Sequence, residues 1–193
     1  MRSSGRYLSV AIPVLALLAV LALPSAATAD NAFVGSKMCK KCHLKQYKSW
    51  EATAMAQAFE TLRPGVKAEE KTAAGLDPAK DYTSDDKCLS CHTVGHGKEG
   101  GFISEAETPN HLGVGCESCH GAGSAYNVEE VHSLKNKEFK QVDVEAAGMI
   151  VEVGEEQCVS CHNSDNPNDT EPFVFETTKD EGNHEHFALK YEH

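Results

Sequence analysis

The apolar residues of this chain are concentrated near its N-terminus. The one long apolar run extends from Val10 to Leu23 and follows the basic residues Arg2 and Arg6. Residues 27–29, Ala-Thr-Ala, then provide the small side chains of a signal-cleavage site. The run is shorter than the roughly 20 residues needed to span a bilayer, and no later stretch is long enough. The pattern predicts a secretory signal at residues 1–29 that is removed, no remaining membrane span, and one working domain at residues 30–193.

Beyond the signal, apolar residues recur in short groups that predict short helices. Ser36 can cap a helix that runs to Leu62, in which Met55 and Phe59 share a face with Leu62, and the Arg-Pro-Gly sequence at 63–65 ends it. Further helices are predicted at 67–74, 127–135 and 183–191, and short extended pieces at 100–103 and 172–175. The expected fold class is mainly α with much irregular structure.

All eight cysteines belong to Cys-x-x-Cys-His motifs. Two thiols three positions apart lie on one helical turn and can add to the two vinyl groups of one haem, while the next residue presents its imidazole to the iron. The pattern predicts four covalently bound haem c groups, and each motif is expected on its own helical turn. The cysteine pairs are Cys39/Cys42, Cys88/Cys91, Cys116/Cys119 and Cys158/Cys161, and the proximal histidines are His43, His92, His120 and His162.

Paired cysteines have two other common uses, as zinc ligands and as disulfides. Neither use requires a histidine immediately after every pair, and no cysteine is left over here. The gaps between successive motifs are 49, 28 and 42 residues, and the shortest gap predicts that the second and third haems lie close together. The motifs are the only internal repeat.

The composition of residues 30–193 changes the expected core. Leucine, isoleucine, valine and phenylalanine make up only about one residue in six of this part, and the whole chain carries a formal net charge of −11. Such a composition is typical of disorder unless something other than side chains forms the core. Four haems would provide that apolar surface, so a multihaem cytochrome c fold organised around them is predicted. The acidic balance excludes nucleic-acid binding, which needs a basic face, and favours a basic docking partner.

The far side of each iron decides the chemistry, because a haem with two protein ligands only transfers electrons, whereas an open face can bind a small molecule. The remaining histidines and the methionines of residues 30–193 are the candidate distal ligands. By spacing alone each of them is equally explained as a surface or packing residue. They are His96, His111, His132, His184, His186, His193, Met38, Met55 and Met149.

Beyond the haem motifs, this part of the chain resembles the tetrahaem cytochrome c five-five-four family. The resemblance lies in Gln46 and Trp50 after the first motif, in the Leu-x-Pro-x-Val of residues 62–66, and in the Leu-Asp-Pro-Ala-Lys-Asp-Tyr-Thr of residues 76–83. It continues through Gly-Val-Gly-Cys-Glu-Ser-Cys-His-Gly at 113–121 and His-Glu-His at 184–186. It implies a mostly helical fold with closely packed haem pairs.

The resemblance also implies a set of distal ligands. His132 would complete the first haem, which has His43 as its proximal ligand, and His184 would complete the fourth. The second haem would be five-coordinate, with Phe173 over its open face. For the third haem, Met55 stands where the family has a histidine; methionine can ligate iron, and His/Met ligation raises the potential. The alternatives are that Met55 only packs, leaving a second open haem, or that His111 or His96 takes its place.

For function, the resemblance implies a periplasmic carrier of electrons from hydroxylamine oxidoreductase, or a similar multihaem enzyme, to a membrane-linked carrier. This chain is acidic where the family carrier is basic, and charge complementarity steers docking. The leading hypothesis is an electron-transfer protein that relays single electrons through four haems between redox partners. The alternative is a small-molecule reductase, for example of nitric oxide, at the open second haem. A subunit of a haem filament is a third interpretation that nothing in the sequence requires.

Overall fold

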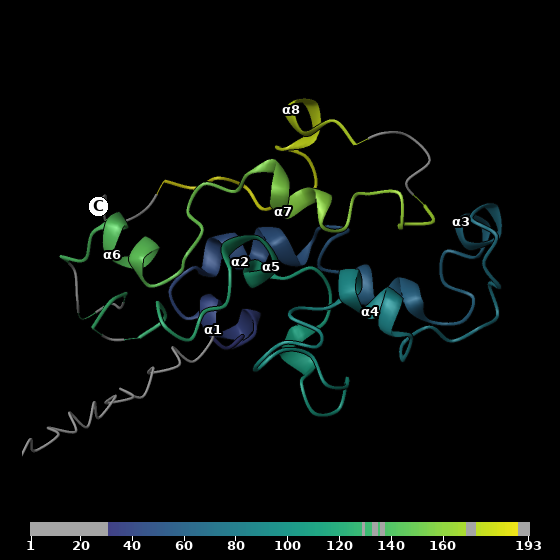
Figure 1. Cartoon of the computed structure of the whole chain (residues 1–193), viewed down its shortest axis with the longest axis horizontal. Coiled ribbons are helices and arrows are strands. Elements are labelled where there is room, and N and C mark those ends of the chain that lie inside the picture. Colours follow the sequence, from purple (N-terminus) through teal and green to yellow (C-terminus); the bar gives the residue numbers. More distant parts are fainter. Residues whose placement is uncertain (1–30, 129, 133–134, 136–137, 169–172, 189–193) are drawn as a thin grey trace, which may run out of the picture.

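A computed structural model of the chain shows short helices joined by long irregular segments (Figure 1). The structure describes residues 31–128, 130–132, 135, 138–168 and 173–188. The predicted signal at 1–29 lies outside this range, as do His193 and parts of the segments predicted at 127–135, 172–175 and 183–191. In the described residues the only β pairing is a bridge between Thr93 and Leu112.

Eight α-helices and two 3-10 helices follow one another along the described residues. Their order is α1 Ser36–Lys40, α2 Leu44–Glu51, η1 Ala58–Leu62, α3 Ala68–Ala73, α4 Asp86–His92, η2 Pro109–His111, α5 Cys116–His120, α6 Gln141–Ala146, α7 Glu155–Val159 and α8 Phe175–Thr178. In Figure 1, α1, α2 and α5 lie together near the middle, α4 lies beside them, and α3 and α6 lie toward opposite ends of the molecule. The mainly α, irregular fold class predicted from the sequence is confirmed.

The single helix predicted from Ser36 to Leu62 is wrong, because the structure divides this stretch into α1, α2 and η1. The first break is at His43, whose backbone angles, φ −107° and ψ 50°, are not helical. A second break follows α2, where the Thr53 hydroxyl donates to the carbonyl of Trp50 and accepts from the amide of Ala56. Such side-chain bonds compete with the helical pattern.

The other predicted elements have mixed outcomes. The helix expected at 67–74 is confirmed as α3, and α1, α4, α5 and α7 carry cysteines of the four motifs. The described part of 183–191 is irregular rather than helical, and the described part of 127–135 contains turns. Residues 100–103 form no strand, and α8 begins at Phe175, where an extended piece was predicted.

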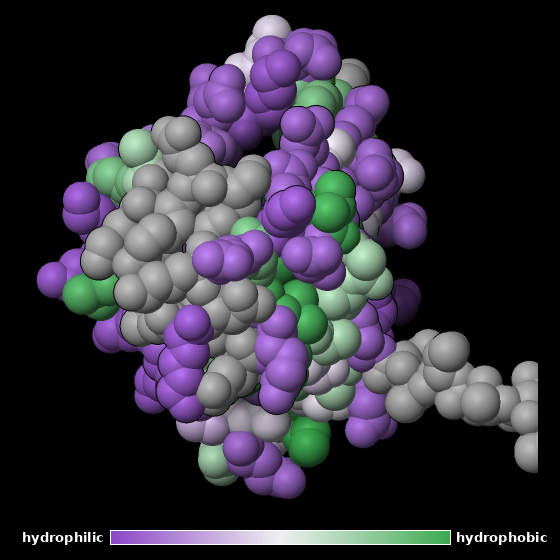
Figure 2. All heavy atoms as spheres, turned by 90° about the vertical axis from the view of Figure 1, so that its left-hand side faces the viewer, coloured by the Kyte–Doolittle hydropathy of each residue, from purple (hydrophilic) through white to green (hydrophobic). Residues whose placement is uncertain are grey.

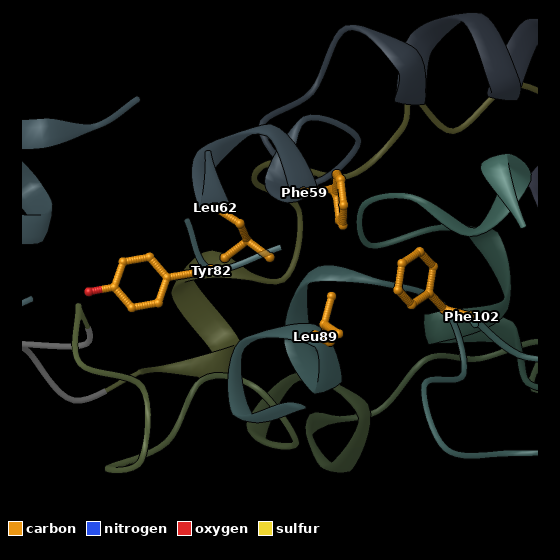
Figure 3. Close-up of a cluster of buried hydrophobic side chains, with 5 residues drawn as sticks. All are labelled: Phe59, Leu62, Tyr82, Leu89 and Phe102. Atoms are coloured by element: carbon orange, nitrogen blue, oxygen red, sulfur yellow. The ribbon is translucent and has the colours of Figure 1, made fainter. Parts of the chain in front are cut away.

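The main cluster of buried hydrophobic side chains lies behind the second haem motif. Phe59, Leu62, Tyr82, Leu89 and Phe102 pack together, with Cys88 at its edge (Figure 3). They come from η1, α4 and the loops around residues 82 and 102. In the described residues only four more hydrophobic side chains are buried, namely Tyr47, Val94, Tyr126 and Val144. The protein core is therefore small, and its main cluster lies beside the second motif.

Polar side chains cover most of the face seen in Figure 2, apart from the residues drawn in grey, and hydrophobic side chains appear as scattered patches. No helix in the described part of the chain is long and apolar enough to cross a membrane.

Candidate haem sites

All eight cysteines are free thiols, so none is used in a disulfide. Among the described residues, no group of three or more histidine, cysteine or acidic side chains is arranged to hold a metal ion. The disulfide and zinc interpretations of the cysteine pairs therefore do not fit the structure.

Cys42 departs from the arrangement that the sequence predicted for the attachment cysteines. It is exposed, whereas the other seven cysteines are all partly buried, and like Cys161 it lies in a turn rather than on a helix. The reason is local: α1 ends at Lys40, and the break at His43 separates the turn from α2. The amides of Cys42 and His43 still donate to the carbonyl oxygen of Cys39, at 3.2 and 2.9 Å. The turn therefore keeps the motif's spacing, but its second thiol faces solvent, and attachment at Cys42 stays a prediction from the motif.

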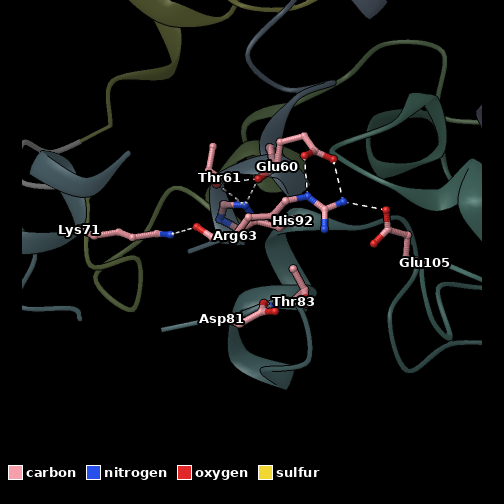
Figure 4. Close-up of polar contacts among 9 residues, drawn as sticks. Glu60, Thr61, Arg63, Lys71, Asp81, Thr83, His92 and Glu105 are labelled. Atoms are coloured by element: carbon pink, nitrogen blue, oxygen red, sulfur yellow. Dashed lines mark hydrogen bonds and ion pairs between the residues drawn. The ribbon is translucent and has the colours of Figure 1, made fainter. Parts of the chain in front are cut away.

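Two of the four proximal histidines are held by backbone carbonyls. Nδ1 of His92 lies 2.6 Å from the carbonyl oxygen of Ala58, which also accepts from the Thr61 hydroxyl (Figure 4). Nδ1 of His120 lies 2.7 Å from the carbonyl oxygen of Ile150. A carbonyl accepts only from a protonated nitrogen, so each ring carries its proton on Nδ1 and leaves the Nε2 lone pair for a metal. This is the arrangement expected of an iron ligand.

Three of the proximal histidines are also biased toward the neutral form that ligation requires. Burial lowers the pKa of His43, His92 and His120, and nearby histidines add to the effect at His43 and His120. A buried imidazolium loses its hydration, so its neutral form is favoured. Neutral imidazole is the metal-binding state.

The rings of His43 and His132 are brought together, with centroids 5.4 Å apart and planes 46° apart. His132 also lies edge-on to Phe139, at 4.7 Å between centroids. Two imidazoles bound to opposite sides of one metal ion, at about 2 Å each, have ring centroids about 6 Å apart, so this pair is somewhat closer than joint ligation requires. The structure thus brings together the two residues that the resemblance assigns to the first haem.

His184 lies elsewhere than expected. Its ring centroid is 6.3 Å from that of His120, and the two ring planes are 27° apart. The ring centroid of His186 lies 5.4 Å from that of His184. The expected partner of His184 was His162, whose ring instead stacks on Phe173 at 4.7 Å. Phe173 was expected over the second haem.

The position of His184 follows from the course of the C-terminal segment. The amide of Glu185 donates to the Ser49 hydroxyl at 2.8 Å, which fixes this segment to α2. The charge of His184 also acts on His43, which immediately precedes α2. The segment therefore lies on the side of the first and third motifs.

The other candidate ligands have different surroundings. The methyl carbon of Met55 lies 3.9 Å from the point where a β-carbon would stand on Gly182, two residues before His184. His111 is 7% exposed, with neither ring nitrogen paired, and packs on Gly35 just before α1. His96 is bound to Asp86 at 3.1 Å, and its ring centroid lies 6.2 Å from that of Phe102.

Contacts between the motifs show how the four of them are arranged. The thiols of Cys39 in the first motif and Cys116 in the third are near enough to shift each other's pKa, and α1 contacts α5. The thiol of Cys91 in the second motif likewise contributes to raising the pKa of Cys161 in the fourth. The field of Cys158 also raises the pKa of Cys119, so the third and fourth motifs are close. The first motif thus lies near the third and the second near the fourth. The second and third motifs are also linked, because the amide of Gly113, three residues before Cys116, donates to the carbonyl oxygen of His92. The closeness of the second and third haems stays a prediction.

Sequence reasoning missed one residue that joins these motifs. Glu117, between the two cysteines of the third motif, accepts hydrogen bonds from the amides of Val34, Gly35 and Gly123. A carboxylate that is flanked by haem cysteines and followed by a glycine-rich stretch was the available signal. Gly35 has φ 81°, and a β-carbon there would press on Asn110 and His111, so this approach requires glycine.

Four haem-attachment motifs with free thiols and prepared imidazoles, set in a small, mainly helical protein, define a tetrahaem c-type cytochrome. A family model described as Cytochrome c554 and c-prime matches residues 38–121. Cytochrome c-554 of Nitrosomonas europaea is 41% identical over 154 residues, which are 77% of this chain and 65% of that protein. The structure of reduced cytochrome c554 from the same organism matches with a TM-score of 0.68 and 34% identity, over 84% of this chain and 89% of that one. The chain belongs to the cytochrome c554 family, and its cofactors are haem c groups.

Proposed function

We propose that this protein is a periplasmic electron-transfer protein that relays single electrons through four c-type haems between redox partners. The observation that carries the proposal is the closeness of the four motifs: α5 of the third motif contacts α1 of the first and α7 of the fourth, and the amide of Gly113 just before α5 donates to the carbonyl oxygen of His92 in the second. Haems attached to motifs this close would have neighbouring edges. The haem irons supply the one-electron chemistry, and the chain fixes their spacing and surroundings.

Export by the signal at residues 1–29 with cleavage before Asp30 is part of this proposal, because haem attachment by thioether bonds belongs to exported cytochromes. The support comes from the basic residues, the apolar run and the Ala-Thr-Ala site of the sequence. The domain at residues 30–193 would then act in the periplasm.

The distal ligands are proposed from the ring pairs. His132 completes the first haem with His43, and His184 completes the third haem with His120, because these rings stand at suitable separations. This assignment changes the expectation for His184, and it leaves Met55 as a residue that packs beside the C-terminal segment. A haem with two imidazole ligands keeps its coordination when an electron arrives, which suits transfer without chemistry.

The partners are proposed from charge. A formal net charge of −11 favours a basic face on the electron donor or acceptor. A hydroxylamine-oxidoreductase-like donor and a membrane-linked acceptor remain the partners that the family suggests, provided that their docking faces are basic.

Electron exchange with a basic partner tests the proposal. The reduced holoprotein is mixed in a stopped-flow instrument with an oxidised basic monohaem cytochrome, and with an acidic one as the control. We expect fast oxidation by the basic cytochrome, with a rate that falls as salt is added, and slow oxidation by the acidic one. Equal rates with both cytochromes that do not depend on salt would contradict charge-steered docking. No electron exchange with either cytochrome would contradict the relay.

One observation favours a second function at the second haem. Among the described residues, no aromatic or imidazole ring is found against the ring of His92, in contrast to the other three proximal histidines. An open face there would bind a small molecule such as nitric oxide. Electron paramagnetic resonance tests it: a high-spin ferric signal that shifts with nitric oxide supports an open second haem, and a purely low-spin spectrum confines the protein to electron transfer.

A further inference from the structure

Two oppositely charged side chains are buried in the described part of the chain, and they lie at different haem motifs. Glu117 is 2% exposed and Lys71 is 5% exposed. Burying a charge is costly, so a protein that retains one uses it for structure or for function. These two charges act on different haems.

Glu117 is bound as a carboxylate by three backbone amides. Oε1 accepts from Val34 at 2.9 Å and from Gly123 at 2.8 Å, and Oε2 accepts from Gly35 at 2.7 Å. In the described residues no cation forms an ion pair with Glu117. The amides satisfy its hydrogen bonds but do not cancel its charge.

The charge of Glu117 acts on the attachment residues of the first and third haems. It contributes to raising the pKa of Cys39, where the larger causes are Cys116 and burial. It also opposes the lowering of the pKa of Cys116, and it adds to burial in raising the pKa of Tyr126. A field that favours protons at these groups also favours positive charge on a haem attached there.

Lys71 acts at the second haem in the opposite sense. Its ammonium group donates to the carbonyl oxygen of Arg63 at 2.6 Å (Figure 4). It also lies 5.5 Å from the centre of the Tyr82 ring. No carboxylate of the described residues forms an ion pair with it; Asp81, which feels its field, is fully exposed. Tyr82 packs in the same buried cluster as Leu89 of the second motif, with Cys88 at its edge, so the charge of Lys71 lies beside the attachment residues of the second haem.

A fixed charge near a haem shifts its midpoint potential, because the ferric haem carries one more positive charge than the ferrous haem. A negative neighbour stabilises the ferric form and lowers the potential, and a positive neighbour raises it. The effect is stronger for buried charges, which water and salt screen less.

We infer that Glu117 lowers the midpoint potentials of the first and third haems while Lys71 raises that of the second. The two charges then make a gradient inside the protein, along which an electron entering at the first or third haem moves toward the second. This inference rests on the proposed electron relay and adds its internal direction. Glu117 and Lys71 are positioning residues in this sense, since neither touches the iron.

Potentiometric titration of five holoprotein variants, followed by absorption and electron paramagnetic resonance, tests the inference. Glu117→Gln removes the negative charge at equal size, and Glu117→Asp keeps it. Lys71→Gln removes the positive charge, and Lys71→Arg keeps it. Glu156→Gln is the control for burial: Glu156 also contributes to raising the pKa of Cys158 in the fourth motif, but it is exposed, so water and salt screen its charge.

We expect Glu117→Gln to raise two of the four midpoint potentials, and Lys71→Gln to lower one, that of the second haem. The charge-conserving variants and Glu156→Gln should leave all four nearly unchanged. Equal movement of all four potentials, or no movement, would overturn the inference, as would the same shift in Glu117→Asp. If Glu117→Gln yields no holoprotein, the Lys71 variants decide the question.

This outcome is separable from the proposed function. A wild-type protein without four reduction steps would contradict the relay itself. Four reduction steps whose midpoint potentials do not change in the Glu117 and Lys71 variants would contradict only the gradient.

Discussion

The backbone carbonyls of two residues orient two of the four proximal imidazoles for iron. The carbonyls of Ala58 and Ile150 each bind Nδ1 of a proximal histidine, at 2.6 Å for His92 and 2.7 Å for His120. Because backbone carbonyls set the tautomer, the ligating nitrogen is fixed by the fold rather than by a neighbouring side chain that mutation could remove.

Replacing the distal residues one at a time should separate His184 from Met55. We expect His184→Ala to convert one low-spin haem to high-spin, because it removes the ring that faces His120. Met55→Leu, which nearly conserves volume, should leave every haem spectrum unchanged and cost less than about 1.5 kcal/mol. Electron paramagnetic resonance of both holoproteins provides the comparison. A new high-spin haem in Met55→Leu would show that methionine is a ligand.

Acid should release the histidine ligands. The folded-state pKa of His43, His92 and His120 lies below the ordinary value of 6.5, chiefly through burial. The unfolded chain therefore binds more protons, so stability is fully present above about pH 6.5 and is lost as the pH falls toward the folded-state values. We expect the low-spin spectrum to persist at pH 7 and to be lost in acid, as followed by absorption. Loss of ligation on raising the pH from 7 to 8 would contradict this direction of the pH dependence.

At the scale of elements, the motifs are joined by contacts that begin far away in sequence. Glu117 in α5 binds the segment that precedes α1, and Trp50 at the end of α2 donates its indole N–H to the carbonyl oxygen of Val114 at 2.8 Å. The C-terminal segment is fixed to α2 through Ser49. These bonds place the first and third motifs together despite the long chain between them.

Removal of the Trp50 bond should loosen this arrangement. Trp50→Phe keeps an aromatic ring but leaves the Val114 carbonyl without its donor, at a cost of about 1–3 kcal/mol for a buried polar group. We expect a lower urea midpoint for the holoprotein. Lys48→Ala, an exposed change in the same helix, is the control and should move the midpoint little. Equal effects of the two changes would show that the indole bond does not hold the motifs.

The sequence predicted the features that depend on a few neighbouring residues. The motif spacing and most of the helical turns that carry it follow from local sequence, and α3 follows from its flanking residues. The exposure of Cys42 did not follow, since it depends on where α1 ends and α2 begins. The pairing of His184 with His120 depends on the bond between Glu185 and Ser49. The contacts between the first and third motifs depend on the course of the whole chain, so sequence spacing alone does not predict them.

At the scale of the whole molecule, the protein has too little apolar side chain to fold alone. The buried cluster around Phe59 and Leu89 lies beside the second motif, and the described residues bury few other hydrophobic side chains. The haems must therefore provide much of the apolar surface that the chain packs against.

The apoprotein should accordingly be largely unfolded. We expect the chain expressed without haem attachment to show little helix by circular dichroism, and the holoprotein to show the content of the short helices described above. The comparison is made at equal chain concentration under reducing conditions, so that disulfides do not stabilise the apoprotein. Native helicity without haem would show that the side chains alone form a sufficient core.

The central claim, a relay of four haems in one chain, is tested most directly by a stoichiometric reductive titration of the purified holoprotein. The absorption of the haems is followed as electrons are added in known amounts. The account predicts that each chain takes up four electrons in one-electron steps. Uptake of fewer than four electrons per chain would contradict it.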